Sequence, residues 1–412
     1  MKWEYVALGD LYEVHNGLSK GGRFFGDGFP FLSFSTVFNK WFLPQELPDL
    51  VQSTDKEQQS YSIQRGDVFV TRTSETMDEL GMSSVALKDY PHATYNGFTK
   101  RLRPINSERI LPEFIGYYLR TPFFRAGFAA FSTMTTRASL RNEDLLSMKV
   151  PVPDIPTQKR IANILSAYDN LIENDQKQIK LLEEAAQRLY KEWFVDLRFP
   201  GHENTKITDG IPEGWEYKPI FDVFDFVRGR SYTSNELSDS TGILMVNLKN
   251  IRAFGGYNRN AEKRFVGQFK DNQILSAGDV IMGVTDMTQE RRLVGHVALV
   301  PNMGETMIFS MDLIKLIPKR TDNLFLYSAM IFGGVSKRIS PLANGVNVLH
   351  LKPEAIMGVE MLIPNDKVVC QYHSQMAPVF SEIETLQKQC DIAAEARDRL
   401  LSKLMNGEKR GG

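Results

Sequence analysis

The stretch that decides the fold is residues 151–194, PVPDIPTQKRIANILSAYDNLIENDQKQIKLLEEAAQRLYKEWF. It contains no glycine, and Pro156 suits the first turn of a helix. Its apolar residues return every three or four positions, interrupted by Asp175, as on one face of a helix. The stripe consists of Ile161, Leu165, Tyr168, Ile172, Ile179, Leu182, Ala186, Leu189 and Trp193. We therefore predict one helix of about 40 residues with an apolar seam.

A second stretch, from Asp366 onward, shows the same pattern more regularly. Its stripe consists of Tyr372, Met376, Val379, Ile383, Leu386, Cys390, Ala393, Arg397, Leu400 and Leu404. Such a stripe can also belong to a helix packed on its own domain, but a helix of about 60 Å overshoots a domain of this size. Glycine and proline in residues 199–202 and 210–214 let the chain turn back between the two helices. We therefore expect the two helices to form an antiparallel coiled coil.

The two halves of the chain repeat each other. A shift of 212 positions carries the triplet WEY at Trp3 to the WEY at Trp215. Further segments match at nearly the same shift: 66–68 (GDV) with 278–280 (GDV), 30–32 (PFL) with 241–244 (TGIL), and 139–153 (SLRNEDLLSMKVPVP) with 350–364 (HLKPEAIMGVEMLIP). Unrelated coincidences would scatter in offset, so the constant shift indicates an internal duplication.

Each half begins with about 150 residues of mixed character, in which short alternating runs such as DVFVTR accompany helical patches. The predicted fold class is α+β: two tandem α/β globular domains, each followed by a long helix, related by a pseudo-two-fold axis. The expected boundaries are 1–154 for the first domain, 155–199 for its helix, 200–365 for the second domain and 366–412 for its helix.

Composition is that of an ordinary soluble protein. The 412 residues are 42% hydrophobic and 24% charged, with 49 basic and 50 acidic residues. Cys370 and Cys390 are too far apart for a Cys-x-x-Cys motif, and neither a signal peptide nor a membrane-length apolar run is visible. We expect a cytoplasmic protein without disulfides and without a membrane partner.

A search for catalytic motifs finds none. The sequence lacks a P-loop, a G-x-G-x-x-G turn, an Asn-Pro-Pro-aromatic motif and an H-E-x-x-H pair, and its six histidines are scattered. Pro153-Asp154 with Lys159 lacks the intervening acid of a nuclease motif. We expect a binding protein with no catalytic residue, no metal site and no cofactor of its own. A coiled-coil scaffold with two protein-binding heads is the alternative, and a self-contained enzyme is a third hypothesis.

Basic residues gather in loops beside Asn, Ser and Thr, although a solvated surface would explain any single cluster as well. Such groups suit phosphate contact and base readout, since Arg pairs with guanine and Asn with adenine. The candidate DNA-binding residues are Asn16, Ser19, Lys20, Arg72, Thr73, Ser74, Arg101, Arg137, Ser139, Arg228, Arg230, Lys249, Asn250, Arg252, Arg259, Arg291, Arg292, Asn344 and Asn347.

Residues 151–194 resemble the conserved central region of type I restriction-modification specificity subunits. The resemblance rests on the proline-rich lead, the QKRIA step at 158–162 and the run Leu165-Ser166…Asp169…Ile172, followed by DLRFPGHE and GIPEGWEY. It covers the whole chain in order. The second copy departs from the pattern, since residues 366–375 retain only Gln371 of the P-T-Q-K-R-I element.

This resemblance implies a non-catalytic subunit in which each head reads one half of a bipartite double-stranded DNA target. Two methylation subunits, which modify an adenine in each half-site, and motor-nuclease subunits would be its partners. S-adenosylmethionine, ATP and Mg²⁺ would belong to those partners. The helices would set the half-site spacing and dock the methylation subunits. The candidate residues for helix pairing and docking are Gln158, Arg160, Ile161, Leu165, Tyr168, Ile172, Leu189, Tyr372, Met376, Val379, Ile383 and Leu400.

Three loops occupy corresponding places in both heads. They are 15–20 with 228–231, after the first strand; 71–74 with 285–288, after the Gly-Asp-Val strand; and 135–139 with 344–347, before the final strand. The framework repeats while the loop chemistry differs. Two heads that read different half-sites require such differences, although ordinary loop drift would look the same.

Overall fold

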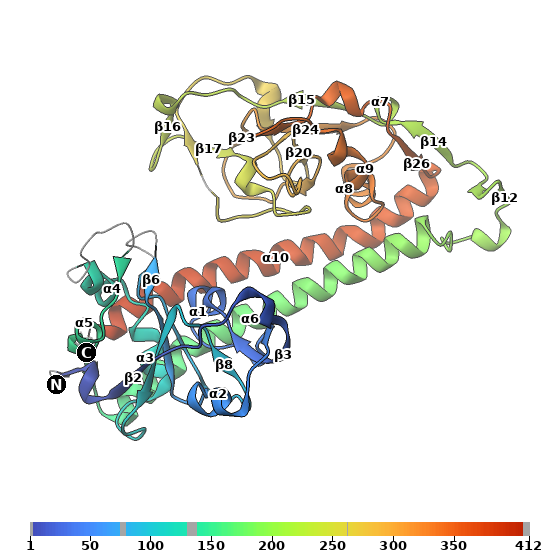
Figure 1. The fold of residues 1–412 in the computed structure, drawn as a ribbon. Helices are drawn as coiled ribbons and strands as arrows, with labels where there is room; N and C mark the ends of the chain where they lie inside the picture. Colours follow the sequence, from blue (N-terminus) through green and yellow to red (C-terminus); the bar gives the residue numbers. More distant parts are fainter. Residues whose placement is uncertain (1–2, 75–79, 130–137, 262, 407–412) are drawn as a thin grey trace. The chain divides into compact units, whose positions relative to one another are not determined.

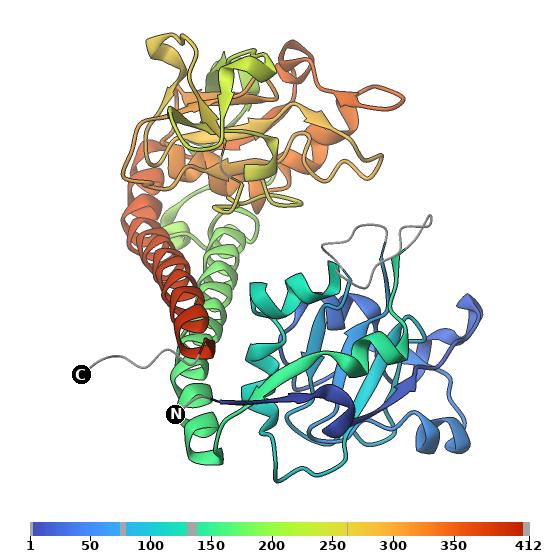
Figure 2. The ribbon, with the colours of Figure 1, turned by 90° about the vertical axis from the view of Figure 1, so that its left-hand side faces the viewer.

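The computed structural model describes residues 3–74, 80–129, 138–261 and 263–406. The chain divides into two compact units. Unit 1 comprises Met1–Asn174 with Gln389–Gly412, and unit 2 comprises Asp175–Lys388. The two long helices predicted from the sequence are α6 (Ile155–Phe194) and α10 (Asp366–Met405), each of 40 residues. Both run unbroken in Figures 1 and 2, and each contributes a segment to both units.

Unit 1 contains a globular head, which we call head 1, with two sheets and two strand pairs. The larger sheet is antiparallel in the order β2 (Tyr12–Asn16), β9 (Thr99–Pro104), β5 (Val68–Thr71) and β7 (Ser83–Val85). The smaller sheet has the order β4 (Asp49–Val51), β3 (Phe25–Leu32) and β8 (Thr94–Tyr95), with β3 and β8 parallel. The pairs are β1 (Glu4–Ala7) with β11 (Lys149–Val152), and β6 (Thr73–Ser74) with β10 (Ala138–Ser139).

Short helices connect these strands. They are η1 (Leu8–Asp10), η2 (Gly22–Phe24), α1 (Phe34–Asn39), α2 (Asp55–Ser60), α3 (Pro112–Tyr118), α4 (Pro122–Ala129) and α5 (Asn142–Ser147). Local sequence explains their starts. Thr54 and Glu57 form a reciprocal capping box at α2, and Pro112 occupies the first turn of α3, where its missing N–H costs nothing.

Unit 2 contains head 2, which repeats this layout. Its antiparallel sheet has the order β15 (Phe224–Arg228), β24 (Leu313–Pro318), β20 (Val280–Gly283) and β22 (Val297–Leu299). The second sheet has the order β16 (Leu237–Ser238), β18 (Arg264–Phe265), β17 (Ile243–Val246), β23 (Met307–Phe309) and β19 (Ile274–Leu275), with β17 and β23 parallel. The pairs are β14 (Glu216–Pro219) with β26 (Glu360–Ile363), β21 (Thr285–Asp286) with β25 (Leu349–His350), and β12 (Ile207–Thr208) with β13 (Ile211–Pro212).

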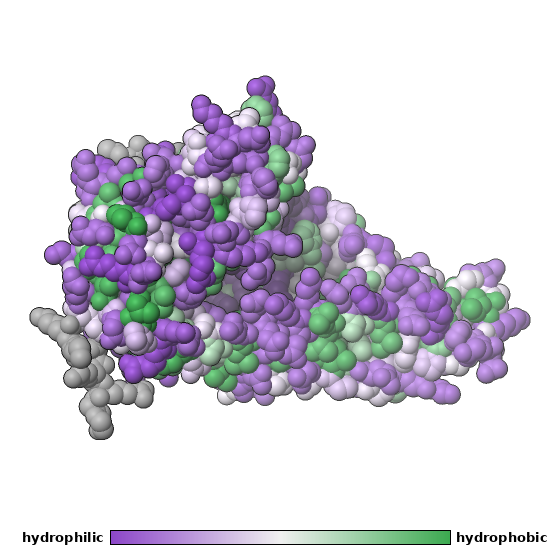
Figure 3. All heavy atoms as spheres, turned by 90° about the horizontal axis from the view of Figure 1, so that it is seen from below, coloured by the Kyte–Doolittle hydropathy of each residue, from purple (hydrophilic) through white to green (hydrophobic). Residues whose placement is uncertain are grey.

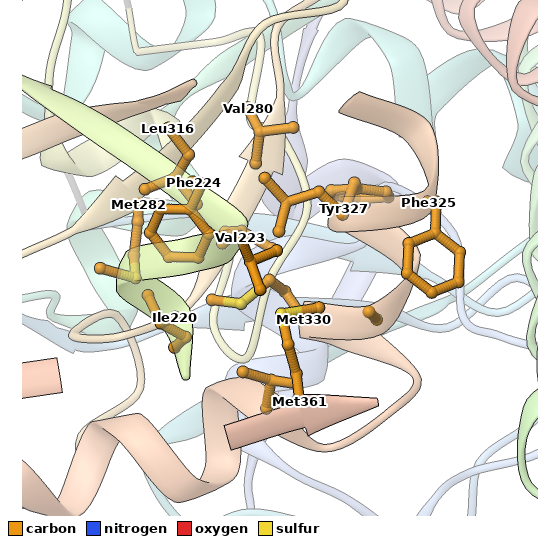
Figure 4. Close-up of a cluster of buried hydrophobic side chains, with 14 of the residues drawn as sticks. Ile220, Val223, Phe224, Val280, Met282, Leu316, Phe325, Tyr327, Met330 and Met361 are labelled. Carbon is orange, nitrogen blue, oxygen red and sulfur yellow. The ribbon is translucent and has the colours of Figure 1, made fainter. Parts of the chain in front are cut away.

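The helices of head 2 are again short. They are η4 (His202–Asn204), α7 (Ile220–Val223), η5 (Ser234–Glu236), η6 (Leu248–Asn250), η7 (Asp271–Gln273), α8 (Asn323–Ile331), α9 (Val335–Ile339), η8 (Ser340–Leu342) and η9 (Pro353–Ile356). The core forms where α8 covers the sheet. Figure 4 shows Phe325, Tyr327 and Met330 of α8 beside Val280 of β20 and Leu316 of β24.

The strand register confirms the internal repeat. In head 1 the WEY strand pairs Glu4 with Val152, and in head 2 it pairs Glu216 with Ile363. The Gly-Asp-Val strands, β5 and β20, each lie third in their four-stranded sheets. The expectation of an α+β chain with two tandem heads is therefore confirmed.

The apolar stripes of both helices are covered, since no stripe residue is exposed. In unit 1, Ile161 and Leu165 of α6 share one cluster with Leu401 of α10 and with Phe114 of head 1. In unit 2, Tyr372 of α10 lies with its ring 5.0 Å from that of Phe194 of α6. Within each unit, residues of the two helices thus pack on each other and on a head.

The surface drawn in Figure 3 is mostly hydrophilic, with apolar side chains in small scattered groups. In the part of the chain that the structure describes, every helix is too short or too polar to cross a membrane.

Candidate nucleic-acid interface

In both heads, a glycine at the end of the first sheet strand brings the following loop against a three-residue turn. A Cβ atom on Gly17 would lie 2.0 Å from the carbonyl oxygen of Asn96, and one on Gly229 would lie 2.0 Å from that of Ser310. Only glycine allows so close an approach without a shift of the backbone. The first loop therefore closes on the turn 96–98 in head 1 and on the turn 310–312 in head 2.

The second and third loops meet at the same turn in head 1. The amide of Arg72 donates to the carbonyl of Phe98 at 3.0 Å, and the amide of Leu140 donates to the carbonyl of Arg72 at 2.9 Å. Strands β6 and β10 pair Thr73 with Ser139 and so join the two loops directly. The first two loops of head 1 and residues 138–139 of the third, whose residues 135–137 lie outside the described ranges, are thus gathered in one cluster, which we call loop cluster 1.

Head 2 repeats this arrangement as loop cluster 2. The amide of Val284 donates to Asp312 at 2.9 Å, and the amide of Leu351 donates to Val284 at 2.8 Å. Strands β21 and β25 pair Thr285 with His350. The same hydrogen bonds therefore hold different side chains on the same framework.

The central turn of each cluster was missed by sequence reasoning. Asn96-Gly97 is a turn dipeptide that could have flagged the first. Ser310-Met311-Asp312 carries no such signal. It could have been found only by extending the repeat, which places YNGFT at 95–99 over FSMDL at 309–313.

Cluster 1 contains two cations, Arg72 and Lys100, for which the described part of the chain supplies no acidic partner. Lys100 is buried and its ammonium donates to the side-chain oxygen of Asn142. Burial lowers the pKa of the Lys100 ammonium, and the positive charge of Arg72 lowers it further. Among the described residues, neither Lys100 nor Arg72 forms an ion pair, and Nε of Arg72 is buried without a hydrogen-bond partner. The cluster can therefore attract a negatively charged ligand such as a DNA phosphate.

Cluster 2 is organised by a buried carboxylate instead. Asp286 accepts hydrogen bonds from the amides of Leu293 at 2.6 Å and Thr288 at 2.8 Å. Burial alone raises the pKa of the Asp286 carboxyl, but these backbone hydrogen bonds outweigh it, and the pKa lies below its ordinary value. The ionised side chain thereby fixes the shape of the loop 287–293.

Several predicted DNA contacts belong to the clusters. Asn16 and Ser19 are exposed in the first loop, and Thr73 is half-buried in the second. In head 2, Asn344 and Asn347 are exposed in the third loop. Ser74 and Ser139 lie in the pairing strands β6 and β10, whereas Arg137 lies outside the described residues.

The two arginines of the first loop in head 2 have partners in their own head. Arg228 forms an ion pair of 2.6 Å with Glu354, and both side chains are exposed. Arg230 donates to the carbonyl of Gln268 at 2.9 Å and to Glu236 at 3.3 Å. Arg228 can exchange its partner for a phosphate more readily than Arg230, because its ion pair is the more exposed to water of the two.

Three other side chains that the sequence predicts as DNA contacts instead form hydrogen bonds within their own heads. Lys20 donates to Glu57 at 2.8 Å. Arg101 is only 4% exposed and donates to the carbonyl of Ser62 at 2.7 Å. Asn250 is 3% exposed and caps the turn at η6. These side chains shape the heads in the structure described.

The remaining candidates lie on residues 249–259 and on the loop 287–293. Arg252 has its guanidinium 3.7 Å from Glu183 of α6 and lines a cavity of about 390 Å³ in unit 2. Lys249 is exposed and Arg259 half-buried. Arg292 is paired with Glu290, and its neighbour Arg291 has a positive φ of 53°.

Of the predicted docking residues of the helices, Arg160 is exposed, whereas Gln158 and the residues of the apolar stripes are covered. Gln158 is buried and ties the start of α6 to head 1, since its oxygen accepts from Leu111 at 2.8 Å and its nitrogen donates to Pro153 at 2.8 Å. Arg160 is exposed beside Ile164. The others lie covered in the stripes: Ile161, Leu165, Tyr168, Ile172, Leu189, Tyr372, Met376, Val379, Ile383 and Leu400.

Metal-ligand chemistry adds no further candidate: within the described ranges, no cluster of three or more His, Cys, Asp or Glu side chains could hold an ion.

Comparison with known proteins agrees with this architecture. The chain is 24% identical to the type I restriction enzyme MjaIX specificity subunit of Methanocaldococcus jannaschii, over 99% of this chain and 94% of that protein. It is 20% identical to the HindI specificity subunit of Haemophilus influenzae, over 98% and 99% of the two chains. The crystal structure of a type I restriction-modification S subunit from M. genitalium matches with a TM-score of 0.60 at 13% identity, over 99% and 97%, which shows the shared fold.

A family model describes the two repeats themselves. The model of the type I restriction modification DNA specificity domain matches residues 1–184 and again residues 212–385. These two matches cover well over half of the chain, one in each repeat. The chain therefore belongs to the type I restriction modification DNA specificity domain family.

Proposed function

We propose that this chain is the non-catalytic DNA sequence-specificity subunit of a type I restriction-modification complex. Each head reads one half of a bipartite double-stranded DNA target through its loop cluster. The observation that carries the proposal is the pair of clusters, in which corresponding backbone hydrogen bonds hold loops of different chemistry: Arg72 and the buried Lys100 of head 1 stand where head 2 has the buried Val284 and Ile314. A shared framework whose loops carry different side chains suits a DNA target with two unlike halves.

The two long helices would act as a spacer between the half-sites. We propose that α6 and α10 form an antiparallel coiled coil with pseudo-two-fold symmetry along their whole length. Contacts within unit 1 support this, since Ile172 lies by Cys390 and Asp169 by Arg397, so that the numbering rises along one helix as it falls along the other.

The methylation subunits would dock on the helices and the heads. The exposed surface of α6 around Lys159, Arg160 and Ile164 offers charged and apolar groups for such a contact. Two methylation subunits would modify an adenine in each half-site, and motor-nuclease subunits would join the full complex. S-adenosylmethionine, ATP and Mg²⁺ would be bound by those partners, and the complex would work in the cytoplasm.

The alternative function is a coiled-coil scaffold with two protein-binding heads. Binding to duplex DNA at several salt concentrations separates the two, because phosphate contacts make affinity fall steeply with salt and specific contacts make it depend on sequence. A scaffold would show no sequence preference.

The decisive experiment is methylome sequencing of cells that express this chain with its cognate methylation subunits. We expect one bipartite motif with a methylated adenine in each half. Two controls complete the test. Cells that lack this chain should show no methylation of the motif, and the purified chain alone should methylate no DNA. Methylation by the purified chain would identify a self-contained enzyme instead.

A further inference from the structure

The turn at the centre of loop cluster 1 is held rigidly. The amide of Asn96 donates to Leu32 at 3.0 Å, and the Asn96 side chain accepts from the amide of Phe98 at 2.7 Å. The hydroxyl of Thr99 donates to the carbonyl of Asn96 at 2.7 Å. Beneath the turn, the ring of Tyr95 is fully buried, 5.0 Å from that of Phe69. The backbone of this turn is therefore fixed from several sides.

This rigid turn presents a bare aromatic ring. Phe98 is 56% exposed, although its neighbours Tyr95 and Thr99 are fully buried. A single exposed apolar side chain is common on protein surfaces and means little by itself. The position of Phe98 distinguishes it from such a residue, because it lies where two loops meet. The carbonyl of Phe98 accepts a hydrogen bond from the amide of Arg72 in the second loop, and Ser19 of the first loop lies against the neighbouring Gly97.

Loop cluster 2 presents an apolar side chain from the equivalent turn. Met311 is also 56% exposed, and its amide donates to the carbonyl of Arg230 at 2.9 Å. Met287 and Val346, from the second and third loops, are 79% and 89% exposed. Gln289 joins these two loops by donating to the carbonyl of Val346 at 2.8 Å. The apolar residue is the third of the turn in head 1 and the second in head 2.

The charges around the two turns differ. Cluster 1 sets Phe98 beside the cations Arg72 and Lys100, whereas the corresponding places in cluster 2 hold Val284 and Ile314. An apolar side chain in the grooves of DNA can contact the methyl group of thymine or enter between two bases. Both contacts need a rigidly placed apolar group within the reading surface, and each turn lies at the centre of its loop cluster.

We propose, on the basis of the function proposed above, that Phe98 and Met311 are specificity-determining residues that contact bases, each in the half-site read by its own head. Apolar contact with bases adds discrimination that phosphate contacts cannot supply. Because the two residues lie at different places of their turns, they present different shapes to their half-sites.

The test uses the full chain in complex with its methylation subunits, and duplex DNA that carries the bipartite motif. Phe98→Ala is expected to weaken binding to this DNA about tenfold or more, as loss of a good base contact does. Phe98→Leu should keep most of the affinity. The matched control is Ile105→Ala, which removes a side chain with 57% exposure just beyond the other end of β9. The salt dependence of binding should not change, since no charge is removed.

Met311→Ala should act on the other half-site alone, with Ile317→Ala, 42% exposed and within β24, as its control. Methylome sequencing should show each variant relaxing base preference in one half of the motif. Uracil in place of thymine identifies a methyl contact if it weakens the wild-type complex but not Phe98→Ala. A rise in 2-aminopurine fluorescence that Phe98→Ala abolishes identifies insertion between bases.

Two results would overturn the inference. The first is that each test variant binds and methylates DNA like its control, Phe98→Ala like Ile105→Ala and Met311→Ala like Ile317→Ala. The other is an equal loss of affinity for cognate and altered half-sites. Either result leaves the proposed function intact, provided that the wild-type complex prefers its motif. If the wild-type complex shows no sequence preference, the proposed function fails and this inference fails with it.

Discussion

Arg397 of α10 and Asp169 of α6 form an ion pair of 2.7 Å within unit 1. Asp169 also accepts a hydrogen bond of 2.5 Å from the hydroxyl of Tyr117 in α3. The guanidinium of Arg397 lies 4.7 Å from the ring centroid of Trp41. These contacts join both helices to head 1, and they explain why a charged residue stands in the apolar stripe of α10.

The repeat gives unit 2 a different junction. The shift of 211 carries Asp169 to Phe380 and Ala186 to Arg397. Phe380 packs edge-on against Tyr327, with ring centroids 5.5 Å apart. An apolar contact thus replaces the polar one at the corresponding place.

We predict that Asp169 and Arg397 stabilise unit 1 cooperatively. A double-mutant cycle with Asp169→Asn and Arg397→Met should give a coupling energy of about 1–3 kcal/mol in urea unfolding, because the pair is half-buried and shares a hydrogen bond. The exposed pair Glu395 and Arg399 on the same helix is the control, with an expected coupling below about 0.5 kcal/mol. Equal coupling for the two pairs would contradict this prediction.

The glycines that bring the first loops onto the turns should be irreplaceable. Gly17→Ala should displace loop 15–20 and weaken DNA binding about tenfold or more, because the added methyl overlaps a backbone carbonyl. Gly229→Ala should do the same in head 2. Gly22→Ala and Gly358→Ala are matched controls, since a Cβ at either place has open space. Affinity measurements by fluorescence anisotropy would refute the prediction if all four variants bind alike.

Asp286 should stabilise unit 2 in a pH-dependent manner. Its carboxyl has a pKa below its unfolded value, so the stabilisation is present above an unfolded pKa of about 3.9 and is lost as pH falls through the folded pKa. Asp286→Asn turns one accepting oxygen into a donor that faces backbone amides. We expect it to lower the free energy of unfolding at pH 7 by about 1–3 kcal/mol.

Thermal unfolding followed by circular dichroism at pH 7 and pH 3.5 tests this prediction. The difference in melting temperature between wild type and Asp286→Asn should be smaller at the lower pH. Asp239→Asn, at an exposed position in the same head, should show no gap at either pH. A gap that widens on acidification would show that the ionised carboxylate is not the stabilising form.

Asp175 should be a weak point of α6. Its side chain is only 2% exposed, and Oδ2 has no hydrogen-bond partner among the described residues. Asp175→Leu restores the apolar stripe and should raise the free energy of unfolding by about 1 kcal/mol or more, because burial of an unpaired polar group is costly. Leu171→Asp, at a 45% exposed position one turn earlier, should leave stability nearly unchanged. A lower melting temperature for Asp175→Leu would show that its carboxylate is stabilising.

The helices should set the spacer of the DNA target. Removal of one heptad from each, residues 172–178 and 383–389, keeps both stripes in phase and shortens each helix by about 10 Å. At about 3.4 Å per base pair, the spacer should shrink by roughly three base pairs while both half-sites stay the same. Methylome sequencing measures both quantities. An unchanged spacer would refute the role of the helices as a ruler.

The sequence predicted the framework of this protein well. Residues 161–193 and 372–404 were recognisable as helices because a stripe at helical spacing is a local pattern. The repeat was recognisable because the WEY and Gly-Asp-Val strands return at one offset. Neither inference needs contacts between distant residues.

The binding surface was less predictable. Arg101 and Asn250 looked like candidate contacts, yet they are buried in their heads. The sequence did not predict Phe98 and Met311 as contact residues, since an isolated apolar residue belongs to no recognisable pattern. Their exposure follows from the way that loops distant in sequence close around the turns at 96–98 and 310–312.

By itself, the sequence determined two α+β heads, two long helices and a family resemblance, because periodicity, duplication and motif spacing are written along the chain. Only the tertiary structure decided which side chains the clusters present. Hydrogen bonds such as those from Arg72 to Phe98 and from Val284 to Asp312 join residues far apart in the chain. Burial depends on all the neighbours of a residue in space, so the chemistry of the surface could be read only after the fold was known.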